Sequence, residues 1–184
     1  ALGAVFDIKQ IHNKDPFLYS SKQAFNIQST ESKKSILIIP GASHSSKRYP
    51  LSKLGELTKL IDANFYLVWG SLEEKMLTKK IQEISPNIHI FNKLSIESLV
   101  ALIDEVDLVI GPDTGPTHIA WALNVPSITL FGPTPGYRNT YQTKINKVIE
   151  SKSKVNPSKI NKSDFSIKDI EVNDIVKISH QLLK

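Results

Sequence analysis

Cysteine is absent from this chain of 184 residues, and its absence excludes several kinds of site. The protein can form no disulfide, hold no thiolate-bound metal and use no cysteine nucleophile. The five histidines, at positions 12, 44, 89, 118 and 180, include no pair with the spacing of metal ligands. We therefore expect neither a metal nor a cofactor.

Long hydrophobic runs are also missing. No stretch approaches the roughly 18 consecutive apolar residues of a membrane-spanning helix. The opening residues, 1–7, lack the charged and hydrophobic regions of a signal peptide. Since the chain does not begin with Met, we expect an internal cut in a longer protein. The lack of cysteine fits a cytoplasmic location.

Three glycine motifs of well-known enzyme classes are missing as well. The chain has no G-x-x-x-x-G-K-[ST] loop, and no G-x-G-x-x-G follows any predicted strand. A Walker-type nucleotide hydrolase and a Rossmann dehydrogenase are therefore disfavoured. The G-x-S-x-G elbow of serine hydrolases is absent too.

Positive charge exceeds negative charge by five, and lysine accounts for most of the excess. Nucleic-acid binders usually carry a denser basic stripe, so we expect no nucleic-acid partner. A solvated lysine-rich surface is the favoured interpretation. Weak attraction to an anionic membrane surface and the binding of small anionic ligands stay open.

Apolar runs and helical periods alternate from residue 35 to about residue 131. The sequence predicts strands at 35–39, 65–69, 88–91, 106–110 and 127–131, with one more at 146–149. It predicts helices at 50–61, at 72–84, from 95, at 114–123 and at 171–183. This alternation indicates an α/β fold with a doubly wound parallel sheet. Sites in such folds lie beyond the carboxyl ends of the strands, here the loops 40–49, 70–74, 92–95, 111–118 and 132–138.

The loop at 111–118 carries the sharpest set of side chains. Asp113, Thr114 and His118 follow a buried strand and open a helix, and Gly115 permits close backbone approach. A helix N-terminus presents backbone N–H groups to an anion. The competing interpretation makes Asp113 a helix cap and His118 a surface histidine, and we favour a ligand site.

Three other loops are ambiguous when taken alone. The segment 40–50 is hydroxyl-rich and basic, which suits a pyrophosphate, although a solvated turn is the better interpretation. Glu73 and Glu74 could accept hydrogen bonds from ribose hydroxyls, or could simply favour the helix dipole. The segment 132–136 either borders the same cleft or forms a rigid turn.

Read together and in this order, the motifs resemble glycosyltransferase family 9. The resemblance rests on P-G-A-S and K-R-Y-P at 40–50, W-G at 69–70, D-T-G-x-x-H at 113–118 with A-L-x-x-P at 122–126, and L-F-G-P-T at 130–134. The family contains the ADP-heptose:lipopolysaccharide heptosyltransferases of Gram-negative bacteria. The D-T-G form is most similar to the heptosyltransferase I branch, since branch II more often has D-S-G.

The resemblance implies the C-terminal, donor-binding domain of a GT-B enzyme with two Rossmann-like domains. Residues 35–150 would form this domain, 1–34 would contain the interdomain linker, and 151–184 would be a loop and a C-terminal helix that often crosses back to the other domain. The general base and the acceptor site would lie in an N-terminal domain that this chain lacks. The fragment alone would then be inactive.

The implied reaction is the inverting, metal-independent transfer of heptose from ADP-heptose to Kdo of lipid A. The implied location is cytoplasmic, with peripheral attachment to the inner face of the inner membrane. Ser43 and Lys47 would hold the diphosphate, and Lys47 would offset charge on the leaving group. Glu74 would take the ribose hydroxyls and Leu94 would lie near adenine.

The remaining implied donor contacts come from the loop at 111–118. Asp113 would bind heptose hydroxyls, while Thr114 and Gly115 would face the phosphates with His118 in support. Ala42 stands where relatives often have a hydroxyl, which could remove one phosphate contact. The pair 116–117, Pro-Thr, replaces a commoner Leu-Ser or Leu-Met pair and could reshape the helix start.

Two other functions stay open. The chain could belong to a GT-B enzyme or epimerase that uses a UDP-sugar, which a preference for UDP over ADP would reveal. It could also be a non-catalytic nucleotide-binding module with the same cleft.

Overall fold

Six parallel strands form the central sheet of the protein. The computed structural model describes residues 14–16, 18–20, 25–31, 33–156 and 158–184. The strands are β1 (Lys34–Ile38), β2 (Ala63–Leu67), β3 (His89–Ile90), β4 (Leu108–Pro112), β5 (Ser127–Phe131) and β6 (Asn146–Glu150). All six predicted strands are present, with ends that shift by up to two residues.

The sheet has the order β3-β2-β1-β4-β5-β6, and every pairing is parallel. From β1 the chain adds β2 and β3 on one side of the sheet. It then returns to the middle, where β4 pairs with β1, and adds β5 and β6 on the other side. This is the doubly wound order, and its switch point lies between β1 and β4. The prediction of an α/β doubly wound fold is confirmed.

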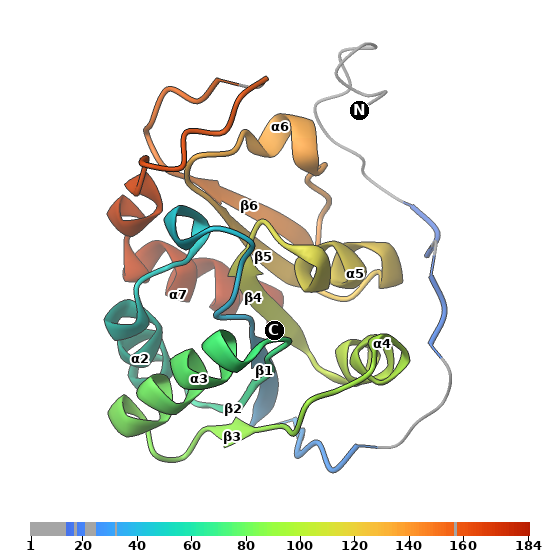
Figure 1. Ribbon diagram of the computed structural model, residues 1–184. Coiled ribbons are helices and arrows are strands. Elements are labelled where there is room, and N and C mark those ends of the chain that lie inside the picture. The colour runs from blue at the N-terminus through green and yellow to red at the C-terminus, as the bar shows by residue number, and fades with distance from the viewer. Residues whose placement is uncertain (1–13, 17, 21–24, 32, 157) are drawn as a thin grey trace.

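Helices cover both faces of the sheet (Figure 1). They are α2 (Leu51–Leu60), α3 (Leu72–Ile84), α4 (Ile96–Glu105), α5 (Gly115–Leu123), α6 (Gly136–Asn139) and α7 (Val172–Leu182), with two 3-10 turns, η1 (Ser45–Lys47) and η2 (Ser166–Asp169). Serines cap two of these helices, since Ser71 Oγ accepts from Glu74 N at 3.2 Å and Ser95 Oγ accepts from Ser98 N at 3.1 Å. The short elements η1, α6 and η2 were not predicted.

The two faces of the sheet build two hydrophobic cores. Along β1, Ile36 and Ile38 pack on one side with side chains from α2, α3 and α7. Leu37 and Ile39 pack on the other side with side chains from α4 and α5. Burial on both faces explains why this strand is a continuous apolar run rather than an alternating one.

The terminal helix α7 closes the first core. Val172 and Ile175 are buried, and the helix packs against α2 and β5. Just before it, Tyr49 Oη donates to the carbonyl of Ile170 at 2.8 Å. The apolar face of this helix is therefore covered by its own sheet.

The described residues before β1 lie along the second core. Phe25 and Ile27 are partly buried against it, and Gln28 N donates to Tyr66 Oη at 2.8 Å. Residues 1–13, the first part of the predicted linker, lie outside the described residues. The linker assignment stays a prediction.

Candidate functional site

A buried ion pair lies at the switch point of the sheet. Lys47, in η1 after β1, donates from Nζ to Oδ2 of Asp113, directly after β4, at 2.8 Å. The two side chains are only 11% and 7% exposed. Their loops follow neighbouring parallel strands, so the sheet itself brings the lysine and the aspartate together.

Asp113 is the common partner of three further side chains. Its Oδ2 also accepts from Thr134 Oγ1 at 3.0 Å and from Asn139 Nδ2 at 3.0 Å. Its Oδ1 lies 3.0 Å from Nε2 of His118, on α5. The carboxylate thus ties together the loops after β1, β4 and β5 with the start of α5 and the end of α6.

These contacts keep Asp113 ionised. Burial alone would raise its pKa, but hydrogen bonds from His118, Lys47 and Thr134, with the positive charge of Lys47, hold the pKa well below its ordinary value. Three side chains, Lys47, Thr134 and Asn139, already donate hydrogen bonds to Oδ2. Oδ1 is therefore the atom that remains for the predicted contact with sugar hydroxyls. That contact stays a prediction.

The N-terminus of α5 is open toward the same edge. Thr114 is the N-cap, so the helix begins one residue later than predicted, and Asp113 is not its cap. The backbone N–H of Thr114 donates to Thr117 Oγ1 at 3.3 Å. A Cβ on Gly115 would meet no atom within 4 Å. Pro116 removes one N–H from this terminus.

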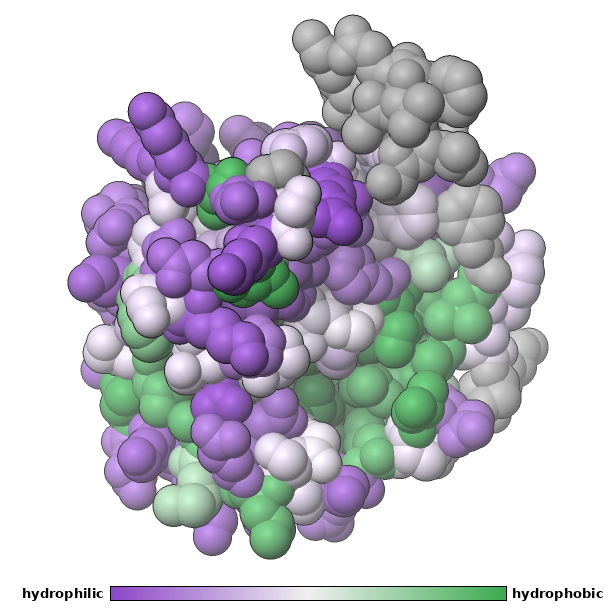
Figure 2. Space-filling view, turned by 45° about the horizontal axis from the view of Figure 1, so that its top comes forward, coloured by the Kyte–Doolittle hydropathy of each residue, from purple (hydrophilic) through white to green (hydrophobic). Residues whose placement is uncertain are grey.

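A cavity of about 350 Å³ adjoins this helix start. It lies between the end of β2 and the first turns of α3, α4 and α5, and Glu74, Leu94 and Thr114 are among its lining residues. Trp69, also in the lining, donates from Nε1 to the carbonyl of Phe91 at 2.9 Å. Figure 2 shows an apolar area on the side of the molecule where α4 and α5 lie in Figure 1.

The structure gives the two adjacent glutamates different positions. Glu74 accepts from the backbone N–H of Gly70 at 2.7 Å, and its carboxylate lies so close to Gly41 that a Cβ there would be 2.1 Å from Oε1. Glu73 instead pairs with Arg48, which also donates to the carbonyl of Ala42. Glu74 therefore faces the cavity, whereas Glu73 fixes the loop after β1.

Ser43 is exposed in the loop after β1 and makes no side-chain hydrogen bond among the described residues. Nearby, Ser46 is fully buried, and its Oγ has no hydrogen-bond partner in the described part of the chain. Of the predicted site residues, the structure brings Lys47, Asp113 and His118 into contact and sets Glu74 and Leu94 around one cavity.

Thr134 and Asn139 are partners that the sequence analysis did not identify. Thr134 lies in the segment 132–136, which therefore contacts Asp113. Asn139 ends the four-residue helix α6, and no local pattern marked it. Across the described ranges, no three His, Asp or Glu side chains are grouped as a metal ion would require, and no helix is long and apolar enough to cross a membrane.

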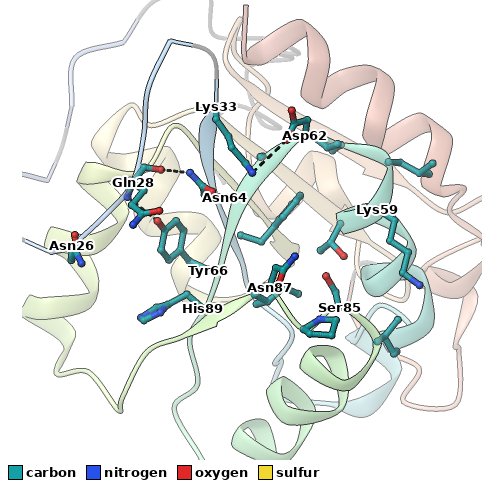
Figure 3. Close-up of a pocket in the computed structure, with 18 residues that line it drawn as sticks. Asn26, Gln28, Lys33, Lys59, Asp62, Asn64, Tyr66, Ser85, Asn87 and His89 are labelled. Atoms are coloured by element: carbon teal, nitrogen blue, oxygen red, sulfur yellow. Dashed lines mark hydrogen bonds and ion pairs between the residues drawn. The ribbon is translucent and has the colours of Figure 1, made fainter.

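A second, larger cavity of about 780 Å³ lies at the amino ends of β1, β2 and β3, away from the Lys47–Asp113 pair. Its polar side chains include Lys33, Asp62 and Asn64, and Figure 3 shows them spread around its wall. Lys33 Nζ and Asp62 Oδ1 are 3.6 Å apart, and Asn64 Nδ2 donates to the carbonyl of Gln28 at 2.7 Å.

Comparison with known proteins identifies relatives of this chain. The family model for glycosyltransferase family 9 (heptosyltransferase) matches residues 4–166. Lipopolysaccharide heptosyltransferase 1 of Campylobacter coli is 43% identical over 158 residues, which cover 81% of this chain and 45% of that protein. The chain thus spans less than half the length of this relative.

Two solved structures share the fold. E. coli heptosyltransferase WaaC with ADP has a TM-score of 0.68 at 20% identity, covering 84% of this chain and 46% of that one. E. coli ADP-heptose lps heptosyltransferase II has a TM-score of 0.68 at 23% identity, covering 84% and 47%. The sheet order, these GT-B neighbours and the family match lead to one conclusion: the chain belongs to glycosyltransferase family 9, the heptosyltransferases.

Proposed function

We propose that this chain is the donor-binding part of a heptosyltransferase that moves L-glycero-D-manno-heptose from ADP-heptose to Kdo of the lipopolysaccharide inner core. The observation that carries the proposal is the buried Lys47–Asp113 pair, at the switch point and beside a cavity of about 350 Å³. A crevice at the switch point is where doubly wound sheets bind nucleotides.

The donor fits this edge in an extended pose. Its adenosine occupies the cavity, with Leu94 near adenine and Glu74 accepting from the ribose hydroxyls. Its diphosphate lies against the N-terminus of α5, where Thr114 faces it, Gly115 offers a backbone N–H group and the helix dipole favours negative charge. The exposed hydroxyl of Ser43 would contribute a further hydrogen bond.

The chemistry is a single displacement. An acceptor hydroxyl attacks the anomeric carbon from the face opposite the diphosphate, the bond to the phosphate oxygen breaks, and ADP leaves with the electron pair. The configuration at that carbon is inverted. The proton of the acceptor passes to a base in the remainder of a longer protein, since relatives are about twice as long as the matched segment.

Lys47 supplies the charge that this step needs without a metal ion. Its ammonium is fixed by Asp113 and can offset the charge that develops on the leaving diphosphate. His118 lies on the same carboxylate and supports the heptose-phosphate end of the donor. In this proposal Asp113 acts chiefly by positioning Lys47 and His118, and its Oδ1 is the atom left for a heptose hydroxyl.

Residues 35–150 form the donor-binding domain in this proposal, and the acceptor, Kdo on lipid A, binds to the part of the longer protein that precedes it. The enzyme then works in the cytoplasm at the inner face of the inner membrane. The 184-residue chain alone binds the donor but does not turn it over.

Calorimetric titration with ADP and with UDP, both in EDTA, tests the proposal. Saturable ADP binding with much weaker UDP binding is the expected result. A preference for UDP would instead favour a UDP-sugar enzyme or epimerase. If the full-length protein bound ADP but transferred no heptose to a Kdo acceptor, a nucleotide-binding module would be the better description.

A further inference from the structure

The loop that follows β6 is closed upon itself by hydrogen bonds. At its base, Ser151 Oγ and Ser166 Oγ are 2.8 Å apart, and Ser153 Oγ donates to Asp164 Oδ2 at 2.6 Å. Ser166 N donates to the other carboxylate oxygen of Asp164 at 2.9 Å. These hydrogen bonds join the two ends of the loop. We refer to residues 151–156 and 158–166 as the basic loop.

The basic loop carries a local excess of positive charge. It contains Lys152, Lys154, Lys159 and Lys162 against a single acidic residue, Asp164. All four lysines are exposed, and none forms an ion pair within the described part of the chain. The carboxylate of Asp164 is held by Ser153 and Ser166 rather than by a lysine. The lysines are therefore free to meet an external anion.

Large apolar side chains stand among these lysines. Ile160 is 40% exposed and Phe165 is 47% exposed. Lysines with interspersed apolar side chains match the surface of an anionic bilayer, where phosphate groups lie above acyl chains. Single-stranded nucleic acid would require a row of stacking aromatic rings, and Phe165 is the one aromatic residue of the basic loop.

The basic loop lies at the edge of the sheet that carries the Lys47–Asp113 pair. Its first residue, Ser151, donates from its backbone N–H to the carbonyl of Phe131, at the carboxyl end of β5, at 2.8 Å. In Figure 1 the loop projects at the upper left, beyond the ends of β5 and β6. Hydrophilic side chains project on the same side of Figure 2.

We propose that the basic loop binds the surface of an anionic lipid bilayer. Its lysines contact headgroup phosphates, while Ile160 and Phe165 enter the interface. Bound in this way, the loop turns the donor edge of the sheet toward the membrane. This orientation rests on the proposed function, in which the acceptor is a lipid; the binding of the loop to lipid does not.

Vesicle co-sedimentation of the 184-residue chain tests the proposal. We expect binding to vesicles of phosphatidylcholine mixed with phosphatidylglycerol, little binding to phosphatidylcholine alone, and release by high salt. The combined change Lys152→Gln, Lys159→Gln and Lys162→Gln should weaken binding about tenfold or more. The matched control is Lys59→Gln, Lys79→Gln and Lys80→Gln on α2 and α3, which removes the same charge and should cost less than about threefold.

Equal losses in the two triple variants would show a general charge effect and overturn the proposal, as would an absence of vesicle binding. Retention of single-stranded RNA that depends on these lysines, without vesicle binding, would assign the loop to nucleic acid instead. Ile160→Ser, checked by thermal melting for folding, should weaken binding roughly threefold, because its apolar surface no longer enters the interface. No effect of this variant would remove the apolar part of the proposal.

ADP titration of the same variants separates this proposal from the donor proposal. ADP affinity should be unchanged in both triple variants, because the substituted lysines lie outside the donor site. Vesicle binding without ADP binding in the unmodified chain would contradict the donor site and leave the basic loop supported.

Discussion

We call the two sides of the sheet at which the parallel strands begin and end its amino edge and its carboxyl edge. Each contains a lysine–aspartate ion pair, and the two pairs differ in how far they are exposed to solvent. At the amino edge, Lys33 and Asp62 are 3.6 Å apart with side chains 48% and 88% exposed. At the carboxyl edge, Lys47 and Asp113 are 2.8 Å apart with side chains 11% and 7% exposed. The amino edge has the larger cavity, about 780 Å³ against about 350 Å³. Our proposal therefore follows the buried, hydrogen-bonded charges at the carboxyl edge rather than the size of the cavity.

The direction of the helices accounts for part of this contrast. In a parallel sheet with crossover helices, the carboxyl edge receives the N-termini of α3, α4 and α5, and the amino edge receives their C-termini. Helix N-termini favour anions, so this edge suits both the carboxylate of Asp113 and the diphosphate of the proposed donor. Lys47 then balances that concentration of negative charge.

The largest expected effect comes from removing the carboxylate at each edge in turn. Asp113→Ala should lower the free energy of unfolding by about 3–5 kcal/mol, because it leaves the ammonium of Lys47 buried and unpaired. Asp62→Ala should cost below about 0.5 kcal/mol, as expected for an exposed pair. Urea unfolding measures both, and similar costs would mean that burial does not distinguish the two edges.

Acid should weaken the carboxyl edge through the same residue. The pKa of Asp113 is lower in the folded protein than its unfolded value of about 3.9, so its stabilisation is present above that value and lost as the pH falls below it. The ionisable side chains that contact it are Lys47 and His118. We expect the difference in unfolding free energy between the wild type and Asp113→Asn to stay level from neutral pH to about pH 5 and to shrink below about pH 4. A difference that stayed constant into acid would contradict the lowered pKa.

Loss of the two lysines should separate the edges in donor binding. Lys47→Ala should weaken ADP binding more than tenfold, roughly 1.4 kcal/mol or more, because the diphosphate loses its cation. Lys33→Ala should leave ADP affinity unchanged, since it lies at the other edge. Calorimetry measures the ADP affinity of both variants. An unchanged affinity in Lys47→Ala would contradict the proposal that Lys47 binds the diphosphate.

The smallest expected effects concern two glycines of the carboxyl edge. Gly41→Ala would place a Cβ 2.1 Å from Oε1 of Glu74, so that this side chain must move and ADP affinity should fall roughly fivefold. Gly115→Ala meets no atom in the free protein and should change the unfolding free energy by less than about 1 kcal/mol. It should still weaken ADP binding if phosphate approaches the helix backbone. Unaltered binding in Gly115→Ala would place the phosphates elsewhere.

Local signals predicted the framework of the fold well. The helix α3 has the predicted bounds, 72–84, and β5 has the bounds of its apolar run. The helix α4 begins directly after its cap Ser95, within one residue of the predicted start. These features depend on residues close together in the sequence, where capping and burial act directly.

The contacts within the site could not be predicted from local sequence patterns. The sequence placed Lys47, Asp113 and His118 at one end of the sheet, but only the folded sheet shows that Lys47 pairs with Asp113. The contact of Asp113 with a sugar, which the family resemblance implies, stays a prediction. Thr134 and Asn139 were missed since their partner lies 21 and 26 residues away. The short elements η1 and α6 have too few residues for a periodic signal.

The separation of Lys47 and Asp113 along the chain bears on the order in which the protein folds. Sixty-six positions separate them, and closing a flexible loop of that length costs roughly 4 kcal/mol in chain entropy. An ion pair in water gains about 1 kcal/mol or less, so it cannot form before the sheet does. Strand pairing between β1 and β4 must come first, so the contact between Lys47 and Asp113 forms late in folding and is not part of the folding nucleus.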